Sequence, residues 1–538
     1  MEFVSDPPID VKIRKMKERV RWQEPPLVKR GIDQTRMVIQ DGAAEDGEFS
    51  FLVIGDSGSG AHGGDNPQRR VAQLMLQQGG GCRFVLHTGD VIYLVGSSEY
   101  YLQNFIQPYQ EFLVGGEDPK RIDSDRMIFK LPFLPVPGNH DYYDLPIVYG
   151  VLAQATWPLR RLLRSKIDLD IGWHGSFQGK AYAKAFLDYL LAFNNEGELS
   201  RHLDSHYTAS TDTGRCLVYQ PGRFTKLPNR YYTFRYGGID FFALDSNTFN
   251  APAPLPHTKE GDNYRRELNQ LKNDLEREKL EILEASAKLN PDSPEDAEQL
   301  DDLRAKLEQI DEVTIDIEKQ LVANDKTTTD FEQLEWLRQR LIESWHTKEV
   351  RGRVVYFHHP PYVTEATKWH QAQTLAVRHR IRWVLDKVAK DVGNLAQDRP
   401  IVDLLLSGHA HCLEYLRTGN TGYADSNLNW IVCGGSGHSL RRQRTEGPEL
   451  METFRDGEKQ VSVKVADSLL FVGRNGQGLQ KRRPYSCLRI DVFDGCPPKF
   501  VVRPLIAELS QRKWSDRQLD PFTVLNAEAN PIRSGLTQ

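Results

Sequence analysis

Five apolar segments of this sequence each end in a small group of side chains that can bind metal ions. Carboxylate, phenolate, amide and imidazole groups together suit hard to borderline cations, and these groups contain no thiolate that would favour a soft metal. The pattern therefore predicts a single site for such cations. The side chains concerned are, in chain order, Asp56, Asp90 with Tyr93, Asn139 with His140, His358, and His409 with His411.

The central member of this set is Asp90, which follows the strand-like run ending at Leu86. Its carboxylate has two oxygens and can bridge two cations, while the phenolate of Tyr93 is a good ligand for a trivalent metal. Each group also has an ordinary structural explanation, because Gly-Asp is a common turn pair and a following aromatic residue often packs in the core. Five such groups in one chain favour the metal site over five separate coincidences.

The elements that must position these side chains are predicted to form a parallel α/β sheet. Residues 49–54 and 84–86 have the pattern of buried strands, and residues 66–78 between them have helical spacing. This strand, helix, strand order is typical of parallel sheets, in which ligands bind outside the carboxyl ends of the strands. The other runs that lead into the groups are residues 133–136, 354–357 and 401–406, and a hairpin is predicted around Gly237-Gly238.

Residues 260–322 have a different pattern, with apolar residues at alternating spacings of three and four. The run 290–294 interrupts it, which predicts an antiparallel coiled-coil hairpin with arms of about 30 residues, each about 45 Å long. The segment contains 19 acidic and 9 basic side chains and so carries −10, whereas the rest of the chain carries +5. Two interpretations stay open: the hairpin mediates dimerisation or binds a protein partner, or it folds on itself as an inserted prop.

The composition is that of a folded protein, and its charge does not favour binding to nucleic acid. The 538 residues allow about two to four domains, and the net charge of −5 argues against nucleic-acid binding. No run approaches the ~20 apolar residues of a membrane helix. The six cysteines have no Cys-x-x-Cys spacing, which favours buried free thiols over a zinc ribbon.

The first 47 residues have mixed charge and little periodicity, which predicts an extension wrapped on the surface or partly disordered. The six cations between Lys12 and Arg21 form either a solvated helix face or a contact with anionic lipid or a partner. The stretch lacks the apolar centre of a signal peptide, so the sequence predicts a cytoplasmic protein.

The order and spacing of the five groups resemble those of the calcineurin-like metallophosphoesterases, and within them those of the purple acid phosphatases. Many members of the superfamily carry a histidine two residues after the first aspartate. This chain has Gly58 there and a tyrosine at position 93, which is the purple acid phosphatase pattern. The matching blocks are Gly-Asp-x-Gly at 55–58, Gly-Asp-x-x-Tyr at 89–93, Gly-Asn-His-Asp at 138–141, Val-x-x-His at 355–358 and Gly-His-x-His at 408–411.

The resemblance implies an α/β fold, namely a four-layer α/β/β/α sandwich of two mixed sheets, here with the helical hairpin inserted. The phosphoesterase domain would then consist of two parts, and an internal insertion would roof the site. The expected segments are an N-terminal extension 1–47, a first part 48–259 with the insertion 145–225, the hairpin 260–322, a second part 323–510 and a C-terminal tail 511–538.

The resemblance also implies a site for two metal ions. The ligands of the first, Fe(III) in the family, would be Asp56, Tyr93 and His411. The second would be a divalent Fe, Zn or Mn held by Asn139, His358 and His409, with Asp90 bridging the two.

The function expected from this site is hydrolysis of a phosphate ester, in the first instance a phosphomonoester. Two cations about 3.5–4 Å apart acidify a water, whose hydroxide attacks phosphorus in line. His140, tuned by Asp141, would protonate the leaving oxygen, and His359 and His370 are weaker candidates for contacts to phosphate. Two alternatives stay open: a manganese- or zinc-dependent phosphodiesterase or nuclease, and a non-catalytic interaction protein that uses the hairpin.

Overall fold

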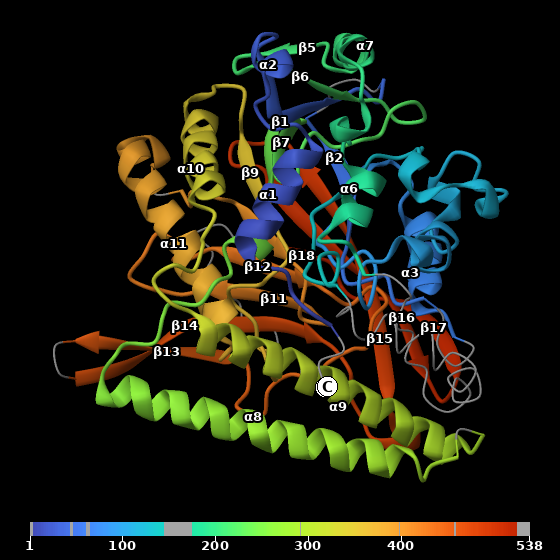
Figure 1. The fold of residues 1–538 in the computed structure, drawn as a ribbon, viewed down its shortest axis with the longest axis vertical. Helices are drawn as coiled ribbons and strands as arrows, with labels where there is room; N and C mark the ends of the chain where they lie inside the picture. The colour runs from blue at the N-terminus through green and yellow to red at the C-terminus, as the bar shows by residue number, and fades with distance from the viewer. Residues whose placement is uncertain are drawn as a thin grey trace.

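Two mixed β-sheets, with helices packed against them, form the body of the protein (Figure 1). This confirms the predicted α/β fold of two mixed sheets flanked by helices. The structure is a computed structural model, and it describes residues 4–42, 47–60, 65–144, 175–290, 292–397, 399–456 and 459–524.

The larger sheet contains eleven strands within the described residues. Its middle strands β8, β9 and β10 are parallel, and β7 pairs with β8 through the predicted two-glycine turn, where Gly237 and Gly238 have φ of +53° and +74°. The order across the sheet is β13 (Glu449–Asp456), β14 (Lys459–Val472), β11 (Leu413–Thr418), β12 (Asn429–Cys433), β10 (Leu404–Ser407), β9 (Gly352–Tyr356), β8 (Ile239–Ala243), β7 (Tyr232–Tyr236), β1 (Ile32–Ile39), β6 (Gly214–Tyr219) and β5 (Ala209–Thr211).

The smaller sheet contains seven strands within the described residues, and its strands β2, β3 and β4 are parallel. The helix α3 (Pro67–Gln78) connects β2 to β3 and packs on this sheet, with Asn66 accepting a hydrogen bond as its N-cap. The order is β17 (Lys513–Gln518), β16 (Lys499–Ser510), β15 (Arg482–Phe493), β2 (Phe49–Ile54), β3 (Cys82–His87) and β4 (Phe133–Pro135), with β18 (Phe522–Thr523) paired to β16.

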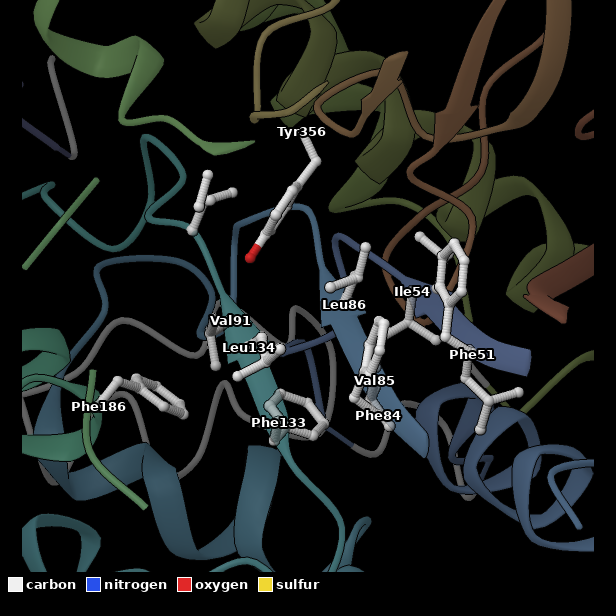
Figure 2. Packing of buried hydrophobic residues seen from close by; sticks show 14 of the residues in the cluster. Phe51, Ile54, Phe84, Val85, Leu86, Val91, Phe133, Leu134, Phe186 and Tyr356 are labelled. Carbon is white, nitrogen blue, oxygen red and sulfur yellow. The ribbon is translucent and has the colours of Figure 1, made fainter. Parts of the chain in front are cut away.

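Aromatic and aliphatic side chains fill the space between the two sheets (Figure 2). Phe51 of β2 and Phe84 of β3 stack with ring centroids 5.2 Å apart, and Phe241 of β8 meets both rings edge-on. On the other face of the larger sheet, a second apolar cluster joins it to α10 (Phe331–His346) and α11 (Ala372–Val392). Both sheets are therefore held in fixed relative positions near the strand ends that carry the predicted ligands.

The two chain ends differ from their predictions. The N-terminal residues form α1 (Ile9–Arg19), α2 (Pro25–Val28) and β1, and β1 lies inside the larger sheet between β6 and β7. Lys12 and Arg19, two of the N-terminal cations, are buried, so they form neither a solvated face nor a lipid-binding one. At the other end, β17 and β18 extend the smaller sheet where a tail was expected.

The described part of the segment 145–225, predicted as an insertion that would roof the site, supplies strands to the larger sheet. Residues 145–174, which include the helix-like stretch 151–163, lie outside the described residues. The remainder contains α6 (Lys180–Phe186) and α7 (Glu196–His206), and it supplies β5 and β6 to the edge of the larger sheet.

Residues 259–322 form two long helices that lie side by side, α8 (Lys259–Ser286) and α9 (Pro294–Val322) (Figure 1). Ion pairs join them, including Lys279 with Asp311 and Lys306 with Glu278. No helix in the described part of the chain is both long and apolar enough to cross a membrane.

A buried arginine ties the strand end of β8 to the start of α10, and its removal is expected to destabilise the fold. The Arg230 guanidinium, 1% exposed, donates to Asp245 at 3.1 Å and to Asp330, the N-cap of α10, at 2.5 Å. Arg230→Met leaves two buried carboxylates without a cation, which is expected to lower the free energy of unfolding by about 3–5 kcal/mol. Chemical denaturation measures the change.

The matched control for this prediction is Arg338→Met. Arg338 also bridges two carboxylates, Glu335 and Asp391, but both of those are more than a third exposed. The loss there is expected to stay below about 1 kcal/mol. Similar losses in the two variants would contradict the role assigned to the buried pairs.

Candidate metal centre

The predicted ligands come from loops at the carboxyl ends of five strands, three in the smaller sheet and two in the larger. β2, β3 and β4 are mutually parallel, and so are β9 and β10. Because the two sheets pack face to face, these ends meet at one edge of the sandwich. The loops that follow them carry Asp56; Asp90 and Tyr93; Asn139 and His140; His358; and His409 and His411.

Three of these residues have a backbone conformation that side chains other than glycine rarely adopt. The φ angles of Asp56, Asp90 and His409 are +54°, +55° and +64°. Such strain persists only where the surrounding structure holds it, and it is concentrated at functional sites. All three side chains are at most 4% exposed.

The hydroxyl of Tyr93 lies among three groups that the sequence separates widely. It is 3.0 Å from Asp56 Oδ1, 2.8 Å from Asp90 Oδ2 and 3.2 Å from His411 Nε2. One phenolic proton cannot serve three acceptor atoms. A cation at this place would satisfy all of them, so these four side chains fit a metal ion.

Gly58 explains why a tyrosine, and not a histidine, completes this group. A Cβ atom at residue 58 would lie 1.8 Å from the carbonyl oxygen of Val91 and 2.5 Å from Cα of Ile92. No side chain fits there, because the loop after β3 occupies the space. The same loop brings the Tyr93 ring to the carboxylates.

A second group lies around His358. Its Nδ1 donates to the carbonyl of Thr88 at 2.9 Å, which leaves Nε2 facing Asn139 Oδ1 at 2.8 Å and Asp90 Oδ2 at 3.2 Å. Both of these partners are acceptors, so Nε2 must carry a proton unless a metal takes its place. His411 is oriented similarly, because its Nδ1 faces the carbonyl of Ser439 at 2.9 Å. A carbonyl that holds one ring nitrogen is a usual support for a metal-binding histidine.

Burial and neighbouring charges shift the pKa values of the predicted ligands. Burial, with the Asp90 charge, raises the pKa of Asp56 to about 8. Burial opposes ionisation of His358, but the Asp90 carboxylate outweighs it and raises the pKa of His358 to about 9. Burial, with nearby Lys368 and Arg441, lowers the pKa of His409 and His411 well below its ordinary value, which keeps both rings neutral as metal ligands.

Among the described residues, two sets of side chains lie close enough to hold an ion. Asp56, Asp90 and His358 form one, and His358, His359 and His409 form the other, each with candidate ligand atoms within 4.8 Å of one another. His359 was expected only as a weak phosphate contact. Its ring nitrogens lie 2.8 Å from Ser246 Oγ and 3.3 Å from the Asn250 amide, so these two side chains orient it.

His140 lies beside the predicted ligands with one nitrogen already committed. Its Nδ1 is 2.6 Å from the carbonyl of Leu94, and its ring lies between those of Tyr93 and Tyr143. Asp141 was expected to tune this ring. Its carboxylate instead accepts backbone N–H groups of Val91, Ile92 and Gly138, so it shapes the loops.

His370 lies elsewhere. Its side chain is exposed, and its charged neighbours are Arg444, Glu446 and Arg378, none of which is a predicted ligand. A contact from His370 to phosphate stays a prediction that its position does not favour.

Four further residues border the site and were not selected from the sequence. His438 stacks on Tyr93 with centroids 3.8 Å apart, and Lys368 Nζ lies 3.1 Å from His409 Nε2. The other two, Glu312 and Arg441, pair with each other at 3.2 Å. Only His438 could have been selected from the sequence, because it follows β12 in a glycine-rich turn. The other three residues lie far apart in the sequence.

Residues 49–314 match the calcineurin-like phosphoesterase family, which confirms the predicted resemblance. The matched region contains the loops after β2, β3 and β4 but ends before His358, His409 and His411. No curated protein matches the chain.

Several solved structures are similar to the chain at low identity. One is GAP50, the anchor in the inner membrane complex of Plasmodium, with 11% identity over 89% of this chain and 90% of that one and a TM-score of 0.34. The purple acid phosphatase PPD1 from yellow lupin (Lupinus luteus) seeds has 11% identity over 93% of this chain and 58% of that one, with a TM-score of 0.39. PhoD has 10% identity over 93% and 75%, with a TM-score of 0.39.

Proposed function

We propose that this chain, whose residues 49–314 match the calcineurin-like phosphoesterase family, is a phosphate ester hydrolase with two metal ions that acts on phosphomonoesters. The observation that carries the proposal is the position of the Tyr93 hydroxyl among Asp56, Asp90 and His411. A buried group of this kind, in which acceptors gather around one hydroxyl, supports a cation site over a simple packing arrangement.

Asp56, Tyr93 and His411 would hold an Fe(III) ion, and Asn139, His358 and His409 a divalent Fe, Zn or Mn ion, with Asp90 between them. Two bound cations would supply Lewis acidity for in-line attack of water on phosphorus. The donor set supports this assignment, because it consists of oxygen and imidazole ligands.

His140 is the group proposed to transfer a proton to the leaving oxygen. Because the Leu94 carbonyl holds Nδ1, the other nitrogen, Nε2, is the one that can carry a proton and release it. The flanking rings of Tyr93 and Tyr143 restrict rotation of the imidazole and keep this nitrogen oriented.

Elemental analysis of the purified full-length protein tests the proposal first. About two metals per chain including iron, together with turnover of phenyl phosphate, would support it. Two metals without iron, with faster turnover of a phosphodiester, would favour the manganese or zinc phosphodiesterase instead. Absence of metal after reconstitution would overturn the assignment of the site.

Tyr93→Phe separates the role of the phenolate from that of the other ligands. In iron-loaded protein, the variant is expected to lose any visible charge-transfer absorption yet retain part of its hydrolysis, because Asp56, Asp90 and His411 are unchanged. An absorption spectrum and a phenyl phosphate assay on the same sample measure both effects. An unchanged spectrum would show that Tyr93 does not bind iron.

A further inference from the structure

One face of α9 is acidic and lies against the body of the protein, between α8 and the two sheets (Figure 1). Its carboxylates pair with cations from distant parts of the chain. Near the start of α9, Asp301 contacts Arg474, Lys481 and Arg483. Further along, Glu308 and Glu312 reach Arg441. The acidic hairpin thus docks on its own chain.

Glu312 is the member of this face that lies at the metal centre. One carboxylate oxygen is 2.5 Å from Lys368 Nζ and the other is 3.2 Å from Arg441 Nη2. Both cations are 1% exposed. Burial opposes ionisation of Glu312, but these two cations outweigh it and lower its pKa to about 2, so the carboxylate is charged.

The same two cations adjoin the predicted metal ligands. Lys368 Nζ is 3.1 Å from His409 Nε2, and the backbone N–H of Arg441 donates to the carbonyl of His411 at 2.9 Å. When His409 Nε2 binds a metal, it can no longer accept a hydrogen bond from Lys368. The Lys368 ammonium then needs another partner, and an anion is suited to that role. Arg441 also has a buried Nε–H with no hydrogen-bond partner among the described residues.

Ion pairs and hydrogen bonds supply much of the docking of α9 on the body, so it can be reversed without opening the core. Among the described residues, neither of the two apolar clusters of the body includes a side chain from α8 or α9. The predicted ligands and His140 are at most 8% exposed in this arrangement. A substrate must therefore displace part of the cover to reach them.

We infer that Lys368 and Arg441 form the subsite for the phosphate oxygens of the substrate, and that the Glu312 carboxylate occupies this subsite as an intramolecular competitor. The inference rests on the proposed hydrolase function. Entry of a phosphomonoester transfers both cations from the carboxylate to the phosphate, and α9 lifts away at this point. A monoester suits the subsite better than a diester, because its two negative charges match two cations in addition to the metals.

The test compares variants with opposite expected effects on the binding of inorganic phosphate to metal-loaded, full-length protein. Glu312→Gln removes the competing charge, so phosphate is expected to bind roughly tenfold more tightly. Lys368→Met removes one cation of the subsite, so phosphate is expected to bind roughly tenfold more weakly. Titration calorimetry measures both constants, and hydrogen exchange of residues 305–316 reports the position of α9.

Both variants break the same ion pair and both are expected to increase exchange in α9. If the two cations only anchor the hairpin, the two variants will change phosphate affinity in the same direction, and this result would overturn the subsite. Phosphate affinity in Glu312→Gln equal to that of the wild type would overturn the competition. Arg441→Met is the second subsite variant if Lys368→Met loses metal.

Glu278→Gln is the matched control, since Glu278 lies on α8 and pairs with Lys306 inside the hairpin. It is expected to leave phosphate affinity unchanged and to alter exchange in residues 305–316 far less than Glu312→Gln, because both side chains of its ion pair are more than 40% exposed. Turnover of phenyl phosphate is measured on the same samples. Opposite shifts in phosphate affinity without any turnover would contradict the proposed hydrolase function and leave the subsite standing.

Discussion

Asp90→Asn is expected to lower kcat/KM for phenyl phosphate by ~10³-fold or more and to reduce the content of both metals. In the wild type, Oδ1 of Asp90 accepts the backbone N–H of His140 at 2.9 Å, and Oδ2 accepts the Tyr93 hydroxyl at 2.8 Å. Asparagine has the same shape, but its amide nitrogen donates, so that nitrogen opposes either the His140 N–H at the Oδ1 position or the Nε2–H of His358 at the Oδ2 position, which is 3.2 Å away. The bridging charge is also lost.

Elemental analysis, steady-state kinetics and circular dichroism of Asp90→Asn separate loss of the site from loss of the fold. Asp516→Asn, which makes the same change beside Arg70 at the surface, serves as the control and is expected to retain metal and activity. Full metal content and full activity in Asp90→Asn would contradict the assignment of Asp90 as the ligand that bridges the two metals.

His140→Asn is expected to slow hydrolysis by ~10²–10⁴-fold for an alkyl phosphate, because a poor leaving group needs the proton that His140 is proposed to supply. For p-nitrophenyl phosphate the loss should be much smaller, since that leaving oxygen departs as a stable anion. Metal content should not change, because His140 is not a predicted ligand and its backbone contact to Asp90 does not involve the side chain.

The informative quantity for His140→Asn is the ratio of the two losses. Equal losses for both substrates would show that His140 does not act as the acid, and a loss of metal would show that it supports the ligands instead. His202→Asn is the control, because that histidine pairs with Asp188 away from the site.

Local patterns predicted the strands that carry the ligands well. β2 begins and ends where its apolar run does, at Phe49 and Ile54, and α3 and α10 start after their N-caps Asn66 and Asp330. The burial pattern of a strand and the capping of a helix depend on residues that are close in the sequence. Both can therefore be predicted from the sequence. β1 was missed because Ile32–Ile39 mixes charged and apolar residues, and its partners β6 and β7 are far along the chain.

The sequence by itself determined the chemistry of the candidate metal centre, because each predicted ligand follows a strand and parallel strand ends must meet at one edge of a sheet. Only the tertiary structure decided what covers that centre. The spacing of α9 predicted a helix with an acidic surface, but not whether that surface faces solvent, a partner or its own chain. Glu312 and Arg441 are 129 residues apart, and an ion pair at this separation depends on the packing of the whole fold, since charge alone specifies no partner.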